Sequence, residues 1–525
     1  MTNGNGSTPE GARFSRRQVF QYSGIAAAAV GGASLLDACG SDSGGGGGGG
    51  GGTGGILVLG ATGGSAKDTL DAHRPVQNAD IARCFQLYEP LLYWDHNYEV
   101  QSAVAESVTP SDDAKTWTIK LRQGVTFHNG KDVTPEDVLY TLQRVAGKEP
   151  TSAGVALAPI IDFNATKKVD ASTVVIQLKT PYAVLQYLLA EYTLGVVPAD
   201  YDPKNPVGTG PFKYKSFSPG KNSVFVKYAD YWGDKAKVDE VHIQDFADPS
   251  AQVNALQAGQ VQTIDNLPYN LINTVKGQAG QIIEAESGAW VPFTMRVDSK
   301  PFTDVRVRQA MRLICDRQQM IDNALSGQGR LGNDLYAPFD PAYASDLPQR
   351  QQDIAQARAL LKAAGQDGLQ VQLFTGDDIG SVAPASAALF AEQAKKAGVD
   401  VKVVKKNPFY GDDYLRYPFA QDFWNTRNYL PQAAVGSLKG GTYNETHFDN
   451  PKFAGLIAAA QREIDESKRN QLLHAAQVIE YNEGGYIIWG FRTQVDAVSS
   501  KVQGLKSSVY QPLGAYNFKT VSLSS

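Results

Sequence analysis

The sequence predicts an α/β protein built from several structural units. Its 525 residues are 42% hydrophobic, and at roughly 150 residues per domain about three units are expected. A half-buried strand is predicted at 117–121, where Trp117, Ile119 and Leu121 alternate with polar residues. A helix is predicted from Thr134, because this N-cap threonine precedes a proline and two acidic residues.

The N-terminus has the order of an export signal. A basic segment at 15–20 is followed by a 13-residue apolar run at 24–36 and then by Cys39. This run suits a signal-peptide core of about 7–15 residues and is shorter than the roughly 20 residues of a spanning helix. Residues 15–20 resemble the twin-arginine signal, which exports folded proteins. Residues 36–40 resemble a bacterial lipobox, which implies that Cys39 is diacylated.

The next segment reads as a tether. Nine consecutive glycines occupy 44–52, and such a linker behaves as a flexible coil. We therefore expect a twin-arginine lipoprotein signal peptide at 1–38, a lipidated tether at 39–55, and folded structure from Ile56. The alternative is a plain signal peptide with a chance cysteine.

The first apolar strand runs into Gly60-Ala-Thr-Gly63-Gly, which is similar to a dinucleotide-binding fingerprint. This pattern raises the alternative of an exported NAD(P)-binding oxidoreductase. In that fingerprint the glycines open a helix, but residues 67–75 lack helical apolar spacing and end in Pro75. The sequence therefore favours a different fold.

The segment 117–145 resembles the signature of the extracellular solute-binding proteins of family 5, the peptide/nickel class. Within it, Asn129-Gly130 predicts a tight turn, and Val138, Leu142 and Val145 share one helix face. Further segments resemble the same family in the same order along the chain. They are 205–212, 228–233, 238–243, 256–265, 301–317 and 357–365.

The resemblance implies a two-lobed periplasmic-binding-protein-like fold, with an extra subdomain in lobe one and the ligand cleft between the lobes. It places lobe one at 56–280, with the extra subdomain at about 95–200. Lobe two is expected at 281–489, with a C-terminal return to lobe one at 490–525. Ligand binding would close the lobes about a hinge.

The same resemblance implies the substrate-binding lipoprotein of an ABC importer, which is not an enzyme. The expected partners are a peptide or peptide-like ligand, permease subunits, and the membrane through the lipid anchor, with the protein a monomer. A ligand sensor without a transport role is an alternative. The ligand itself stays open between a peptide, an opine, another small anionic or zwitterionic compound, and a metal chelate.

The cleft residues are inferred from the aromatic and charged positions of the family. Its peptide binders hold the ligand's amino terminus with an aspartate after a tryptophan, whereas this chain has Arg427 after Trp424. An arginine suits a carboxylate or another anion, unless Arg427 is merely solvated or structurally paired. The predicted ligand-binding residues are Thr62, Gly63, Trp290, Phe293, Trp424, Arg427, Asn428, Tyr429 and Glu445.

Composition excludes other classes. The net charge of −5 and the lack of basic runs argue against nucleic-acid binding. The six histidines are scattered without an i, i+4 pair, so no metal site is predicted, and no cofactor is expected. With Cys39 lipidated, Cys84 and Cys315 are expected to be buried free thiols.

Overall fold

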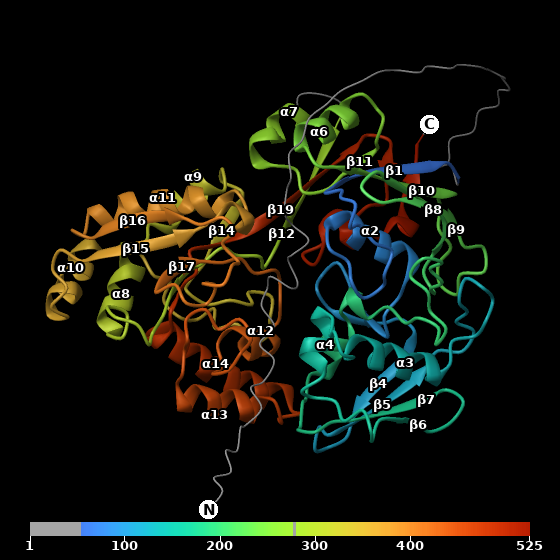
Figure 1. Cartoon of the computed structure of the whole chain (residues 1–525), viewed down its shortest axis with the longest axis horizontal. Coiled ribbons are helices and arrows are strands. Elements are labelled where there is room, and N and C mark those ends of the chain that lie inside the picture. Colours follow the sequence, from blue (N-terminus) through green and yellow to red (C-terminus); the bar gives the residue numbers. More distant parts are fainter. Residues whose placement is uncertain (1–53, 277–279, 525) are drawn as a thin grey trace, which may run out of the picture.

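The molecule is built on two mixed sheets that the chain connects twice. The computed structural model describes residues 54–276 and 280–524. The predicted signal peptide, Cys39 and nearly all of the tether lie outside the described residues. Figure 1 shows two halves side by side, with β12 (Gly280–Glu286) and β19 (Gly490–Ser499) running between them. Among the described helices, none is long and apolar enough to cross a membrane.

The first sheet has the order β12-β19-β11-β1-β10-β9-β8, with β14 pairing the far end of β19. Its first strand, β1, pairs in parallel with both β10 and β11, and the other pairs are antiparallel. The remaining strands are β1 (Ile56–Thr62), β8 (Phe212–Ser218), β9 (Asn222–Lys227), β10 (Glu240–Phe246), β11 (Thr263–Ile264) and β14 (Gly329–Leu331).

A smaller antiparallel sheet, in the order β4-β5-β7-β6, lies within residues 105–177. The predicted strand is confirmed as β5 (Thr116–Leu121), whose inward residues are Trp117, Ile119 and Leu121. The predicted helix start is also confirmed, because Thr134 forms a capping box before α3 (Pro135–Val145). The other strands are β4 (Ala105–Pro110), β6 (Lys167–Lys168) and β7 (Thr173–Gln177).

The second large sheet has the order β16-β15-β17-β13-β18. Its strands are β13 (Phe293–Met295), β15 (Gln370–Thr375), β16 (Asp400–Lys405), β17 (Phe419–Gln421) and β18 (Tyr486–Ile487). Two short antiparallel pairs complete the strands: β2 (Leu92–Trp94) with β3 (Val100–Ser102), and β20 (Val502–Gln503) with β21 (Ser522–Leu523).

Helices cover both sheets. Those before the first crossing are α2 (Asn78–Leu87), α3, α4 (Ser152–Leu157), α5 (Leu185–Leu189), α6 (Pro249–Gln257) and α7 (Ile272–Lys276). Those after it are α8 (Val305–Ile314), α9 (Arg317–Ala324), α10 (Ile354–Ala363), α11 (Val382–Lys395), α12 (Tyr429–Gly436), α13 (Pro451–Ala460), α14 (Glu466–Glu483) and α15 (Pro512–Ala515).

The two crossings between the sheets are short. Residues 287–292 lead from β12 into β13, and residues 488–489 lead from β18 back into β19. β12 and β19 pair antiparallel along seven positions, so the crossing segments are anchored side by side. Because β12 belongs to the first sheet, that sheet continues to Glu286, a little beyond the boundary expected at 280.

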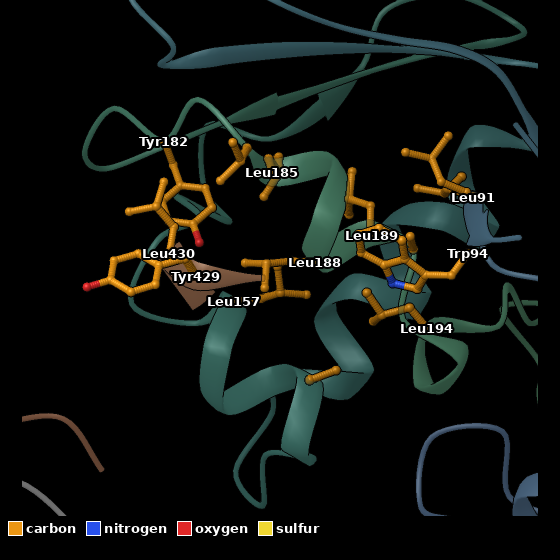
Figure 2. Close-up of a cluster of buried hydrophobic side chains, with 14 of the residues drawn as sticks. Leu91, Trp94, Leu157, Tyr182, Leu185, Leu188, Leu189, Leu194, Tyr429 and Leu430 are labelled. Carbon is orange, nitrogen blue, oxygen red and sulfur yellow. The ribbon is translucent and has the colours of Figure 1, made fainter. Parts of the chain in front are cut away.

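Separate hydrophobic clusters fill the two halves, and one cluster spans them. It joins α4 and α5 to the start of α12, and Figure 2 shows Tyr429 and Leu430 near Leu157, Leu188 and Tyr182. The halves are therefore in apolar contact in this structure. Elsewhere in the core, Cys84 and Cys315 are buried free thiols, which confirms that prediction.

Candidate ligand cleft

A cavity of about 470 Å³ lies between the two halves. One wall comes from residues 94–193 and the other from residues 423–461. Its volume is within the roughly 300–1,000 Å³ typical of small-molecule sites. A wider groove of about 710 Å³ beside α14 is solvent-open and is lined by the second half alone. The cavity lining includes Trp94, Tyr98, Tyr187, Glu191, Phe423, Trp424, Asn425, Arg427, Asn428 and Tyr443.

An aromatic stack positions Trp424 on the wall of the second half. The backbone N–H of Trp424 donates to the Trp290 carbonyl at 2.9 Å, and the backbone N–H of Trp290 donates to the Trp424 carbonyl at 3.0 Å. The Trp290 ring stacks on Trp424 at a centroid distance of 6.0 Å and on Tyr336 at 5.8 Å. Trp290 is only 1% exposed, so it holds Trp424 in place from behind and does not itself line the cavity.

The Arg427 guanidinium lies over the Trp424 ring, 5.6 Å from the ring centroid. This cation–π contact leaves its N–H groups available. Across the described residues, no carboxylate oxygen lies within 4.0 Å of the guanidinium. An arginine that faces a cavity without an ion pair is suited to bind a ligand carboxylate through two parallel hydrogen bonds.

Asn428 adds a buried acceptor beside this arginine. It is the N-cap residue of α12 and is 4% exposed. Its Oδ1 atom has no hydrogen-bond partner within the described part of the chain. A buried acceptor left unpaired costs about 1–3 kcal/mol.

The opposite wall is aromatic. Trp94 stacks on Tyr98 at a centroid distance of 4.2 Å and lies 5.4 Å from Tyr187. The Tyr98 hydroxyl donates to the Thr426 carbonyl at 3.5 Å, a long contact that links the two walls. The aromatic faces provide apolar surface for a ligand, and the polar groups on either side fix its orientation.

Glu191 brings a carboxylate to the same cavity. It follows α5, and its Oε2 atom accepts a hydrogen bond from the Tyr510 hydroxyl at 2.9 Å. Burial raises the pKa of the Glu191 carboxyl above its ordinary value, while Arg427 and the Tyr510 hydroxyl limit that rise. The cavity therefore contains an acid on one wall and a guanidinium on the other.

Of the residues predicted from the sequence, the structure brings Trp424, Arg427 and Asn428 together on the cavity. Thr62 and Gly63 lie elsewhere. The Thr62 backbone N–H donates to Asp265 Oδ1 at 2.6 Å and its hydroxyl donates to the same atom at 2.8 Å.

The glycine loop after β1 is closed by a side chain. A Cβ atom at Gly63 would lie 2.2 Å from Gln77 Oε1, and the same oxygen accepts from the Gly64 N–H at 2.8 Å. The first helix after the loop begins only at Asn78. This geometry lacks the helix N-terminus that a pyrophosphate would need.

The other predicted residues are packed away from the cavity lining. Phe293 is 0% exposed and packs on Phe390 at a centroid distance of 4.6 Å. Tyr429 is also 0% exposed, and its hydroxyl donates to Glu480. Glu445 is 5% exposed and accepts a hydrogen bond from the Tyr486 hydroxyl. Phe293 and Glu445 therefore support the second half of the molecule from within, whereas Tyr429 belongs to the hydrophobic cluster that spans the halves.

Sequence reasoning missed the first-half wall, namely Trp94, Tyr98, Tyr187 and Glu191. The clustering of aromatic residues at 92–98 and 187–192 was the available signal. Over the residues that the structure describes, no group of three or more His, Cys, Asp or Glu side chains is arranged to hold a metal ion.

Two lobes, paired crossing strands and a cavity between the lobes are the features of proteins that bind a solute between two domains. The family model described as "Bacterial extracellular solute-binding proteins, family 5 Middle" matches residues 99–445. The chain therefore belongs to this family, as its sequence signature predicted. It is a substrate-binding protein of the ABC importer class, and the oxidoreductase alternative is not supported. The family consists of extracytoplasmic transport proteins and not of enzymes.

Curated relatives align over most of the chain. The dipeptide-binding protein of Escherichia coli is 26% identical over 473 residues, covering 81% of this chain and 86% of the relative. Di/tripeptide-binding protein 1 of Pseudomonas aeruginosa is 28% identical over 426 residues, covering 73% and 78%. The glutathione-binding protein GsiB of Salmonella typhimurium is 25% identical over 465 residues, covering 84% and 90%.

Solved structures share the fold. The periplasmic binding protein DppA of Helicobacter pylori, in complex with peptide STSA, has a TM-score of 0.73 at 23% identity. That match covers 90% of this chain and 99% of the other. The substrate-binding protein CtaP of Listeria monocytogenes has a TM-score of 0.80 at 21% identity, covering 90% and 100%. These likenesses confirm the predicted two-lobed fold.

Proposed function

We propose that this chain captures a small peptide or peptide-like solute bearing a carboxylate and delivers it to the permease subunits of an ABC importer. The observation that carries the proposal is the Arg427 guanidinium, which lies over Trp424 in the cavity between the halves, without an ion pair among the described residues. The printed names of the relatives, which include dipeptide-, di/tripeptide- and glutathione-binding proteins, support the peptide class.

Mass spectrometry of the solute released when the purified protein is denatured tests this proposal. A released peptide, or retention of members of a mixed di- and tripeptide library, is the expected result. A released compound without any carboxylate, together with no retention from the library, would refute it. The Arg427→Ala variant is the matched control, because it should release or retain much less of the same compound.

We also propose that Cys39 carries the lipid that attaches the protein to the outer face of the cytoplasmic membrane. The lipobox-like residues 36–40 and the glycine tether support this assignment. Cys39→Ala should release the folded protein from membranes, because the acyl chains would be its hydrophobic attachment. Retention of the variant on membranes washed with high salt would contradict the assignment. Replacing Arg16 and Arg17 with Lys should block export by the twin-arginine route.

The working unit is proposed to be a monomer with lobe one at 56–280 and 490–525, lobe two at 281–489, and an extra subdomain at about 95–200. The sheet pairings support this division, since β12 and β19 lie side by side where the chain crosses. Such paired crossing strands are suited to act as a hinge between the lobes. The protein acts by binding and has no catalytic residue in this proposal.

A further inference from the structure

Glu191 is held rigidly on the first-half wall of the cavity. It lies between α5 and a 3₁₀ turn at Tyr192–Leu194. Leu188 and Leu194, on either side of it, belong to the hydrophobic cluster that spans the two halves. The backbone at Glu191 is therefore fixed by packing, and the Tyr510 hydroxyl restrains its carboxylate from one side. A group fixed in this way is preorganised to read a ligand.

The Glu191 carboxylate has no cation of its own. Across residues 54–276 and 280–524, no Lys, Arg or His nitrogen lies within 4.0 Å of it. Burying a carboxylate without an ion pair is unfavourable, and binding sites relieve the cost when the ligand supplies the opposite charge. Arg427 is the charged side chain that most favours the ionised form of Glu191, although it lies on the opposite wall.

The charges of Glu191 and Arg427 both act on the hydroxyl of Tyr98. Glu191 raises the pKa of the buried Tyr98 hydroxyl beyond the effect of burial itself, and Arg427 acts on that hydroxyl in the opposite direction. Tyr98 lines the cavity, so the acid and the guanidinium lie near one another around it. They form no direct ion pair within 4.0 Å, and both line the same cavity. A ligand with opposite charges at its two ends can therefore present one end to each.

We infer that the cleft binds a zwitterionic ligand in one orientation: Glu191 accepts hydrogen bonds from the ligand ammonium, and Arg427 binds the ligand carboxylate. The inference rests on the proposed function and specifies the ligand class of that site. The sequence resemblance implied an acid after Trp424, but here that position carries a cation and the acid comes from the opposite wall. The ligand amine is therefore directed toward the extra subdomain. Because the two charges are on different lobes, a ligand with both termini free stabilises closure, whereas a ligand with one charge engages one lobe.

The test compares three forms of one dipeptide library: free, N-acetylated and C-amidated. Retention is measured by mass spectrometry on wild type, Glu191→Gln and Arg427→Gln, followed by calorimetric titration of the best-retained member. Glu191→Gln keeps an oxygen for the Tyr510 hydroxyl and removes only the charge. The matched controls are Glu392→Gln and Arg358→Gln, which are exposed positions outside the cavity lining.

Wild type should bind the free form about 10- to 150-fold more tightly than either capped form, the range of a hydrogen bond to a charged group. Glu191→Gln should abolish the preference for a free amine and keep the preference for a free carboxylate. Arg427→Gln should do the reverse. Variants that weaken all three forms equally would show that Glu191 and Arg427 merely attract one another across the cleft. If Glu191→Gln instead removed the preference for a free carboxylate, and Arg427→Gln the preference for a free amine, the assigned orientation would be wrong. Either result overturns the inference while the proposed function stands.

A second set of probes separates failure of the inference from failure of the proposed function. If wild type retains no dipeptide, the peptide proposal fails, and 6-aminohexanoate, hexanoate and hexylamine are titrated instead. The inference predicts that the zwitterion binds at least about tenfold more tightly than either singly charged compound, from the same range. Equal affinities for the three compounds would overturn it.

Discussion

Replacing Asp334 with Asn is predicted to destabilise the second lobe strongly. The Asp334 carboxylate is completely buried and accepts two hydrogen bonds from Arg317 Nη2 at 2.8 and 2.7 Å. It also accepts from Arg350 Nε at 2.8 Å and from the Ile488 backbone N–H at 3.1 Å. Ile488 lies in the second crossing between the sheets. One carboxylate therefore neutralises buried guanidinium groups and anchors the chain at the crossing.

The magnitude follows from this geometry. Burial on its own raises the pKa of the Asp334 carboxyl, but Arg317, Arg350 and Arg312 hold that pKa below its ordinary value. In Asp334→Asn the carbonyl oxygen can still accept from Ile488, whereas the buried guanidinium groups lose their counter-charge. Removing one partner of a buried ion pair costs about 3–5 kcal/mol. That is a large part of the roughly 5–15 kcal/mol by which a typical protein is stable.

Urea unfolding followed by fluorescence and by circular dichroism measures this effect, and two probes are needed because the lobes can unfold separately. The control is Asp377→Asn, whose ion pair with Lys405 is solvent-exposed and should contribute no more than about 1 kcal/mol. If Asp334→Asn lowers the free energy of unfolding no more than this control does, the argument from buried charge is wrong. A loss within the range stated above is the expected result.

Three further predictions concern binding, closure and pH. Arg427→Ala should weaken binding of the co-purified solute by about 10- to 150-fold. Arg427→Asp should weaken it by more, because it also places a second carboxylate opposite Glu191. If calorimetry gave wild-type affinity for a folded Arg427→Asp protein, Arg427 would not be part of the site. Saturation with that solute should reduce the radius of gyration in solution scattering and raise the Tm, and an unchanged scattering curve would argue against lobe closure. Burial lowers the pKa of His128 from 6.5 to about 4, so below pH 6.5 the unfolded chain binds a proton that the folded protein does not. This histidine's contribution to stability should therefore fall between pH 6.5 and about 4, and an NMR titration of the imidazole that gives a pKa near 6.5 would contradict this.

Local patterns determined much of the secondary structure. Thr134 and Pro135 predict the start of α3, because helix capping by a side chain and the fixed φ of proline are local effects within the first turn of a helix. Gly365 follows the end of α10 with a φ of 68°, a conformation in which glycine has little strain. The family signature, spread over several such local segments, also predicted the family and its two-lobed fold correctly.

The tertiary structure decided which residues form the cavity. Trp424, Arg427 and Asn428 were predicted together because they are neighbours along the chain. The opposite wall escaped prediction, since Trp94 and Glu191 meet Arg427 only after more than 200 intervening residues have folded. The pattern of residues within a single segment does not predict that two segments so far apart in sequence line one cavity.

Burial likewise separated supporting residues from lining residues. Phe293 and Tyr429 have the aromatic character of a binding site, yet Phe293 is enclosed by its own lobe and Tyr429 is buried in the cluster that spans the lobes. The sequence by itself determined the class of the protein and the cation at position 427. The acid that faces this cation was decided only by the packing of one lobe against the other, because a charge acts through space, without regard to the order of residues in the chain.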